Sequence, residues 1–238
     1  MYRYVFFDLD GTLTQSEFGI VEAASRALAH FGIETPNRDL LKRFIGPPLY
    51  VSFHEFYGLS DEDSFEAIRV YREYYEREGV YLAPLFAGVA EMLRKLKDAG
   101  CRLMIVTSKP KPMAEVVAKH EGVRDLFEGV VGPSLEGRDP NKAALIREAM
   151  AALGLSDEKT SETEGSEDRG ESADKGIRKE ILMVGDRFYD IKAAVEVGVD
   201  SVGVLYGYGN EQELRESGAT YIVKTPMDIA DVVLGGRN

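Results

Sequence analysis

The stretch YVFFDLDGTLT, residues 4–14, decides the fold of this chain. Its first half is an apolar run that ends in the acid Asp8, which is typical of a buried strand carrying a carboxylate to the edge of a sheet. If the extended geometry persists, strand alternation places Asp8 and Asp10 on the same side. Gly11 permits a sharp turn that brings backbone N–H groups towards an anion. The stretch therefore predicts a first strand that ends in paired acids.

Similar apolar runs recur along the chain, and helical patterns separate most of them. The predicted strands are residues 4–8, 102–107, 130–131, 181–185, 201–205 and 221–223, and the predicted helices are 88–99, 112–120, 141–153, 189–197 and 211–216. This alternation predicts an α/β fold with a doubly wound, Rossmann-like parallel sheet covered on both faces. Catalytic groups in such sheets lie beyond the carboxyl ends of the strands. Asp8, Thr107 and Asp186 each follow a predicted strand at that end.

Residues 15–84 interrupt the alternation, because they are helical in pattern throughout. Ser16 is a suitable N-cap for the first helix, and Ser60 or Asp61 for the last. An all-helical block inserted after the first strand predicts a cap domain, although such helices can also complete the core of a single domain. We therefore expect a catalytic core of residues 1–14 and 85–238, with a helical cap at 15–84.

Residues 156–176 have a different composition, with eight acids, three bases and Ala173 as the one apolar residue. Such a segment buries too little apolar surface to offset the entropy lost on ordering. We predict a disordered acidic insertion between a helix and a strand.

The chain has 238 residues and a net charge of −12, which argues against a nucleic-acid polymer as partner. A small phosphorylated substrate remains compatible with this charge, because a divalent cation and a few basic groups reverse the local field in a cleft. No apolar run approaches the roughly 20 residues of a membrane helix. The early first strand leaves no room for a signal peptide, and the single cysteine, Cys101, fits a reducing compartment. We expect a cytoplasmic protein without a membrane partner, and its oligomeric state stays open.

Two segments offer a nucleophile and a binding site for phosphate. Hydrolysis of a phosphate monoester needs a nucleophile, a proton for the leaving oxygen and positive charge around the transferring group. Asp8 and Asp10 can divide this work, one as the ionised nucleophile and the other as a proton carrier. Thr107 and Ser108 offer adjacent hydroxyls to phosphate oxygens, although such a pair is also common in turns and helix caps.

Two further segments offer positive charge and metal ligands. Lys142 begins a predicted helix, where its charge opposes the helix dipole, and this misfit indicates that it neutralises an anion. Asp186 follows a strand, and Asp190 lies four residues further on. Their carboxylates are hard oxygen ligands of the kind that magnesium prefers, although Asp186 is equally suited to cap the next helix.

The order of these motifs resembles the haloacid dehalogenase superfamily, and the block at 15–84 resembles its small helical (C1-type) cap. The segments Gly46-Pro47-Pro48 and Thr107-Ser108-Lys109-Pro110 are most similar to the phosphoglycolate phosphatase-like and 5′-nucleotidase-like branch. The resemblance implies a magnesium-dependent phosphatase for a small phosphorylated metabolite.

The resemblance also implies a role for each motif. Asp8 would attack phosphorus to form an aspartyl phosphate, and Asp10 would act as the acid and then the base. Lys142 would offset the negative charge on Asp8 and on the phosphoryl group, and Thr107 and Ser108 would hold phosphate oxygens. Mg²⁺ would be bound by Asp8, the backbone carbonyl of Asp10, Asp186 and Asp190.

The substrate is the least determined part of this prediction. A phosphoglycolate phosphatase-like activity is the first expectation. The alternatives are a 5′-nucleotidase, a β-phosphoglucomutase-like phosphomutase and a catalytically silent binding protein. Specificity would come from the cap, where Arg43, Tyr50, His54 and the turn Gly46-Pro47-Pro48 are the candidates, and Arg43 would pair with a substrate carboxylate. Lys42 would be the imine-forming lysine of a phosphonate hydrolase, but no surrounding feature supports that activity.

Overall fold

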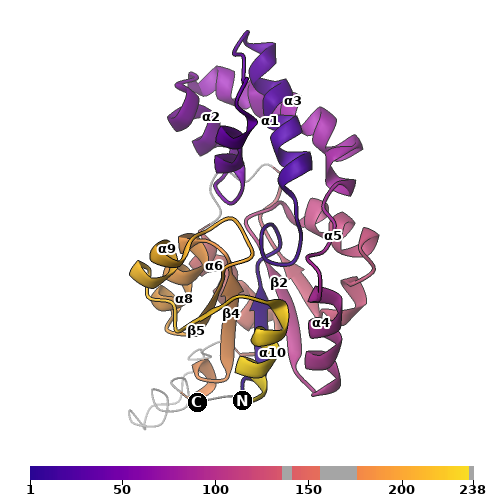
Figure 1. Cartoon of the computed structure of the whole chain (residues 1–238), viewed down its shortest axis with the longest axis vertical. Helices are drawn as coiled ribbons and strands as arrows, with labels where there is room; N and C mark the ends of the chain where they lie inside the picture. Colours follow the sequence, from indigo (N-terminus) through magenta and orange to yellow (C-terminus); the bar gives the residue numbers. More distant parts are fainter. Residues whose placement is uncertain (136–140, 156–175, 236–238) are drawn as a thin grey trace, which may run out of the picture.

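The computed structural model describes residues 1–135, 141–155 and 176–235. A helical cap lies at one end of an α/β core, and the N-terminus lies at the other end of the core (Figure 1). The predicted insertion at 156–176 falls outside the described residues except for Gly176.

The core is built on a parallel sheet of six strands in the order β3-β2-β1-β4-β5-β6. The strands are β1 (Tyr4–Phe7), β2 (Arg102–Val106), β3 (Gly129–Val131), β4 (Ile181–Gly185), β5 (Asp200–Val204) and β6 (Tyr221–Val223). This arrangement confirms the predicted doubly wound sheet, and the strand bounds differ from the predicted ones by one residue or so. The first strand lies in the centre, between β2 and β4.

Helices cover both faces of the sheet, as the alternation of strands and helices predicts. They are α4 (Val89–Asp98), α5 (Lys111–His120), α6 (Lys142–Ala152), α8 (Phe188–Val197), α9 (Glu211–Glu216) and α10 (Pro226–Leu234), with a short 3₁₀ turn η3 (Arg124–Leu126). Val5 and Phe7 of β1 pack with α4, α5 and α10, whereas Tyr4 and Phe6 pack with α6 and α8. Because successive side chains point to opposite faces, the apolar run of β1 contributes to two separate cores.

The cap consists of helical elements alone, as the sequence predicts. They are α1 (Glu17–His30), η1 (Arg38–Phe44), α2 (Leu49–Tyr57), α3 (Asp61–Arg77) and η2 (Gly79–Tyr81). Ser60 caps α3 by accepting the N–H of Asp63, whereas Ser16 precedes α1 without a side-chain cap hydrogen bond. The cap has apolar contents of its own, including the fully buried Leu41 and Phe53.

Two neighbouring linkers join the cap to the core. The N–H of Gln15 donates to the carbonyl of Pro84 (2.8 Å), and the N–H of Phe86 donates to the carbonyl of Leu13 (3.0 Å). Inside the cap, a Cβ on Gly19 would lie 2.2 Å from the carbonyl oxygen of Gly79, so only glycine allows this backbone approach. The first and last elements of the cap therefore lie against each other where the chain enters and leaves it.

Candidate active site

The topology brings the acidic residues together at one edge of the sheet. β1 pairs with β4 in a register that places Phe7 beside Val184, and with β2 in a register that places Phe7 beside Ile105. The residues that follow these strands therefore meet at the same edge. Asp8 follows β1 there, and Asp186 follows β4.

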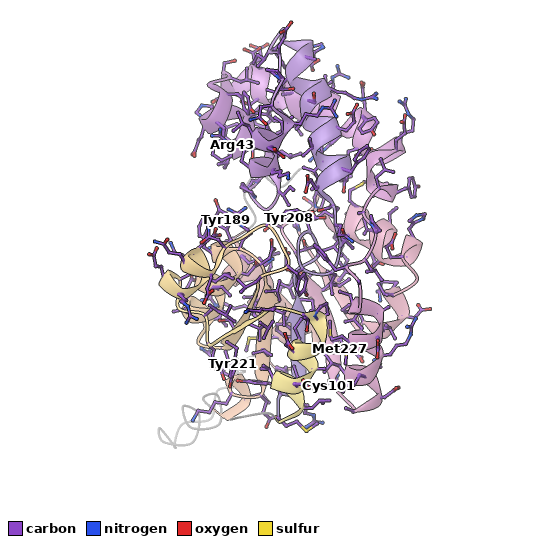
Figure 2. All side chains as sticks on the ribbon, viewed as in Figure 1. Arg43, Cys101, Tyr189, Tyr208, Tyr221 and Met227 are labelled. Atoms are coloured by element: carbon purple, nitrogen blue, oxygen red, sulfur yellow. The ribbon has the colours of Figure 1, made fainter. Side chains whose placement is uncertain are left out.

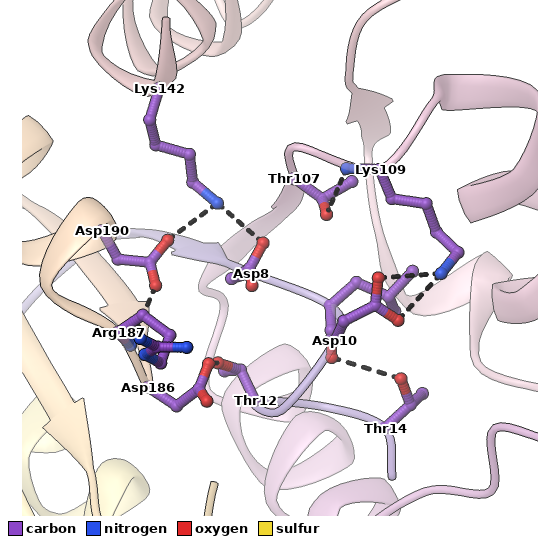
Figure 3. Close-up of polar contacts among 11 residues, drawn as sticks. Asp8, Asp10, Thr12, Thr14, Thr107, Lys109, Lys142, Asp186, Arg187 and Asp190 are labelled. Atoms are coloured by element: carbon purple, nitrogen blue, oxygen red, sulfur yellow. Dashed lines mark hydrogen bonds and ion pairs between the residues drawn. The ribbon is translucent and has the colours of Figure 1, made fainter. Parts of the chain in front are cut away.

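Three carboxylates form a buried cluster at this edge (Figure 3). One oxygen each of Asp8, Asp186 and Asp190 lies within 4.8 Å of the others. The three residues are 7%, 0% and 3% exposed. Burial raises the pKa of Asp8 to about 6, because desolvation outweighs the Lys142 ammonium, which lowers the pKa. A group of buried hard oxygens with this much negative charge suits a divalent metal ion.

Lys142 joins two of these carboxylates. Its Nζ donates to Asp8 Oδ1 at 2.7 Å and lies 2.8 Å from Asp190 Oδ1. Burial alone lowers the pKa of the lysine, but the charges of Asp190 and Asp8 raise it above its ordinary value, so it stays an ammonium. The lysine stands at the first position of α6, behind the N-cap Asn141, and the misfit with the helix dipole is compensated by these anions. One ammonium neutralises one of three charges, and a divalent cation would balance the other two.

Asp186 is held by groups from the loops around it. Tyr208 donates its N–H to Asp186 Oδ2 (2.8 Å), and the hydroxyl of Thr12 donates to Oδ1 (3.3 Å). Gly11 has φ +86° and would place a Cβ 2.4 Å from the same carboxylate, which explains the glycine in the turn after β1. Burial and the nearby charges of Asp190 and Asp8 raise the pKa of Asp186 well above its ordinary value.

Asp190 combines a structural role with its place in the cluster. Its Oδ2 accepts the N–H of Arg187 at 3.3 Å in a capping box that starts α8. Its other oxygen faces Lys142. The side chain is thus fixed from two directions and orients the lysine that contacts Asp8.

The Asp10 side chain points away from this cluster and is paired with Lys109. The Lys109 Nζ donates to both Asp10 oxygens, at 2.9 and 2.8 Å, and both side chains are nearly buried. The same nitrogen lies 4.8 Å from the ring centre of Tyr75, which belongs to the cap helix α3. The cap and the paired acid are therefore in contact through one lysine.

The two predicted phosphate-binding residues lie beside this pair. Thr107 follows β2 and is 1% exposed, and its hydroxyl accepts the N–H of Lys109 at 3.2 Å. Thr107 and Ser108 both line a cavity between the cap and the core, together with Asp8 and Asp10. The structure brings these four residues together at one end of that cavity.

The cavity has a volume of about 490 Å³, and cap residues form most of its wall. Gly46 lies in this wall, as expected for a specificity residue, but Arg43 and His54 do not. Arg43 packs over the ring of Phe56, 4.0 Å from its centre, and lies in the cap above Tyr189 and Tyr208 of the core (Figure 2). The expectation that Arg43 or His54 lines the substrate cavity does not fit these positions, because an exposed helical residue faces whichever side its packing selects.

Sequence reasoning missed several residues that complete the site. Lys109 is the main omission, and its place directly after Thr107 and Ser108 was the available signal. Thr12 and Tyr208 both donate to Asp186; Thr12 stands in the opening stretch at 4–14 but was given no role, and Tyr208 had no distinguishing pattern in the sequence. The backbone N–H of Tyr208 comes from the loop after β5, so only the fold brings it to Asp186.

Comparison with known proteins agrees with this geometry. Residues 2–198 match the family of haloacid dehalogenase-like hydrolases. The chain belongs to this family. Among the described residues, no helix is both long enough and apolar enough to cross a membrane.

Curated relatives of this hydrolase carry several names. It is 36% identical to a 5′-nucleotidase of Pseudomonas aeruginosa, over 92% of the chain and 90% of that protein. It is 34% identical to the tyrosine-protein kinase PtkA of Mycobacterium tuberculosis, over 92% of the chain and 68% of that protein. It is 30% identical to a phosphoglycolate phosphatase of Vibrio vulnificus, over 98% of the chain and 96% of that protein.

The fold is shared with solved structures. A predicted phosphatase from Clostridium acetobutylicum superposes with a TM-score of 0.85 at 34% identity, covering 98% of this chain and 99% of that one. Together with the family match and the relatives named as phosphatases, this identifies the chain as a phosphatase of the haloacid dehalogenase-like family.

Proposed function

We propose that this phosphatase is a magnesium-dependent hydrolase of small phosphomonoesters, with Asp8 as the nucleophile. The contact of Asp8 with Lys142 inside the carboxylate cluster carries the proposal. A carboxylate at the end of a cavity, fixed by an ammonium that also offsets phosphate charge, has the two properties that attack on an anionic ester requires.

The residues divide the reaction into two displacements. In the first, an oxygen of Asp8 forms a bond to phosphorus, the bond to the leaving oxygen breaks, and Asp10 gives that oxygen a proton. In the second, Asp10 takes a proton from water as the water oxygen attacks phosphorus, which releases phosphate and restores the Asp8 carboxylate. Lys109 contacts both oxygens of Asp10 and so holds this side chain in one orientation at the cavity.

The same geometry supports a binding mode for the phosphoryl group. Thr107 and Ser108 line the cavity together with Asp8, and their hydroxyls would hold phosphate oxygens. Lys142 would balance charge that shifts between Asp8 and the phosphoryl group.

Magnesium is the metal that best fits the donor set. The side chains of Asp8 and Asp186 and the backbone carbonyl of Asp10 would hold it, with Asp190 in support, since all are hard oxygen donors. The ion would screen the negative charges of the nucleophile and the phosphoryl group as they approach each other.

The proposed substrates are phosphoglycolate and nucleoside 5′-monophosphates, both acted on by relatives according to their names. Arg43 was expected to pair with the carboxylate of phosphoglycolate. It does not line the cavity in which a substrate would bind, but packs on Phe56.

A panel of phosphate esters tests the proposal. Phosphate release from p-nitrophenyl phosphate, phosphoglycolate, nucleoside monophosphates and sugar phosphates should require Mg²⁺ and should disappear in Asp8→Asn. Release that persists in Asp8→Asn would contradict the nucleophile. Isomerisation of a sugar phosphate without net phosphate release would instead identify a phosphomutase.

A further inference from the structure

The cavity extends along most of the cap helix α3. Phe65, near the start of the helix, and Tyr75, near its end, both line the cavity. Ten residues of α-helix separate them, a distance of about 15 Å along the axis. Tyr75 lies at the end of the cavity next to Lys109 and Asp10, so Phe65 lies at the end far from the proposed reacting groups. A two-carbon glycolate bound at Asp8 would leave this far end unused.

Aromatic rings gather at the far end. Phe65 of α3 and Tyr50 of α2 both line the cavity, with ring centres 5.4 Å apart and planes inclined by 33°. Phe65 is 42% exposed, which is unusual for a large apolar side chain beside a polar helix surface. Both rings come from helices, so their positions are set by the cap before any ligand arrives.

Neighbouring residues hold Tyr50 in place. His54, one helical turn away, stacks on it with ring planes inclined by 13°. The Tyr50 hydroxyl donates to Asp61 at 2.8 Å, which joins α2 to the start of α3. His54 therefore stabilises the position of Tyr50, although His54 itself does not line the cavity.

The cationic side chains in the cavity wall are paired with other groups of the protein. Arg69 pairs with Glu66 and Glu73 on its own helix. Arg72 donates to the carbonyl of Leu135, and Lys109 is paired with Asp10. Within the described residues, the far end of the cavity thus contains two aromatic rings, and the guanidinium of Arg69, which also lines the cavity, is paired with two carboxylates.

We propose that Tyr50 and Phe65 form a stacking subsite for a flat heteroaromatic ring on the leaving group, which makes nucleoside 5′-monophosphates the substrate class. This inference rests on the proposed phosphatase function and deepens it. The phosphate lies at Asp8, the sugar spans the middle of the cavity beside Ile68 and Tyr71, and the base lies against the two rings. Stacking on aromatic side chains tolerates different bases, because every base has a π face.

A substrate pair that differs only in the base tests the subsite. Adenosine 5′-monophosphate and ribose 5-phosphate share the phosphate and the sugar, so their kcat/KM ratio isolates the base. Phe65→Ala should lower kcat/KM for adenosine 5′-monophosphate about tenfold and leave ribose 5-phosphate within about twofold. Phe65→Trp, which keeps an aromatic face, should retain the preference for the nucleotide.

Phe18→Ala is the matched control, since Phe18 is an exposed cap phenylalanine (66%) that does not line this cavity. This variant should have the same kcat/KM as the wild type for both substrates. Equal losses for the two substrates in Phe65→Ala, or a wild-type enzyme that prefers phosphoglycolate, would overturn the subsite.

A binding measurement separates this inference from the proposed function. Calorimetry with adenosine, which has no phosphate, should detect binding to the wild-type protein and weaker binding to both Phe65→Ala and the conservative Phe65→Leu. Binding that is equal in all three proteins would overturn the subsite even if hydrolysis proceeds as proposed. A wild type that hydrolyses none of the esters would overturn the phosphatase function, whatever the outcome with adenosine.

Discussion

The catalytic edge of the core and the α3 wall of the cap face the same cavity, but they are built differently. Asp8, Asp186 and Asp190 are at most 7% exposed and have partners from separate elements of the core. Phe65, on the wall, is 42% exposed, and Arg69 pairs with residues of its own helix. The core side chains are thus tied to several elements, whereas Arg69 is tied to its own helix.

Three of the contacts that join the cap to the core are made by long cationic side chains. Arg187 of the core donates to the carbonyl of Ile45 at 3.2 Å, Arg72 of the cap donates to the carbonyl of Leu135, and Lys109 lies over the ring of Tyr75. These polar contacts lie beside an apolar cluster in which buried residues of the cap and of the core belong together. In the proposal, the chemistry belongs to the buried carboxylates of the core and substrate choice to the cap side chains that line the cavity. Substitutions in the core should therefore affect all substrates alike.

The largest effect is expected for the nucleophile. Asp8→Asn should lower kcat for every substrate by at least about 10³-fold, because the amide cannot form the phosphoenzyme. Quench-flow with a ³²P-labelled ester should find label on the wild-type protein and none on the variant. Circular dichroism should show an unchanged fold. A substrate-dependent loss would contradict the division between the two regions.

Lys142→Met should produce the next largest effect. A loss of about 10²–10³ in kcat is expected on all substrates, since the ammonium balances charge on Asp8 and the phosphoryl group. Removing one partner of a buried ion pair also costs about 3–5 kcal/mol of stability, which urea unfolding would measure. Arg147→Met is the matched control, because Arg147 is an exposed cation of the same helix that pairs with Glu196 on the surface. Equal behaviour of the two variants would contradict the assigned role.

Metal removal tests the carboxylate cluster through stability as well as activity. In the metal-free protein the pKa of Asp8 is about 6, above its ordinary value of 3.8. A carboxyl group with a raised folded-state pKa favours folding while it is protonated, so this contribution is lost as the pH rises from 3.8 to about 6. Mg²⁺ replaces the proton, and it should therefore raise Tm more at pH 8 than at pH 5. Calorimetry with and without EDTA at the two pH values measures this, and an equal shift at both would count against the site.

Arg187→Ala tests the attachment of the cap. Losing its bond to Ile45 should raise KM for all substrates about fivefold and change kcat less, because the cap would spend less time closed over the core. Steady-state kinetics on adenosine 5′-monophosphate and ribose 5-phosphate should give the same ratio as in the wild type. A changed ratio would place Arg187 in substrate recognition.

The smallest effect on activity is expected at the start of α3. Ser60→Ala removes the N-cap hydrogen bond to Asp63 and should lower stability by about 1 kcal/mol. Thermal unfolding measures this loss, and kcat on p-nitrophenyl phosphate should stay as in the wild type. A fall in kcat would show that the cap contributes to the chemistry itself.

The carboxylate cluster could be predicted from the sequence, because the position of a residue that directly follows a strand is fixed by the sheet. Asp8 and Asp186 end neighbouring parallel strands, so the register of the sheet brings them together. Lys142 could be assigned from its conflict with the helix dipole, which its two carboxylate partners resolve. The helical content of residues 15–84 was equally predictable from their pattern.

The positions of side chains on helices and in loops could not be predicted from the sequence in the same way. Arg43 and His54 have suitable chemistry for a substrate, but their packing turns Arg43 onto Phe56 and His54 onto Tyr50. Asp10 was expected to offer its backbone carbonyl to the metal and its side chain as acid and base, and the pairing of that side chain with Lys109 was not predicted.

The apolar runs, the acids that follow them and the order of the motifs predicted the fold, the acidic edge and the class of chemistry, because these features can be recognised without knowing any distant contact. Only the tertiary structure decided that Lys109 pairs with Asp10 and that Tyr50 and Phe65 line the cavity. These contacts join residues from different elements, and their distances depend on how the cap packs over the core.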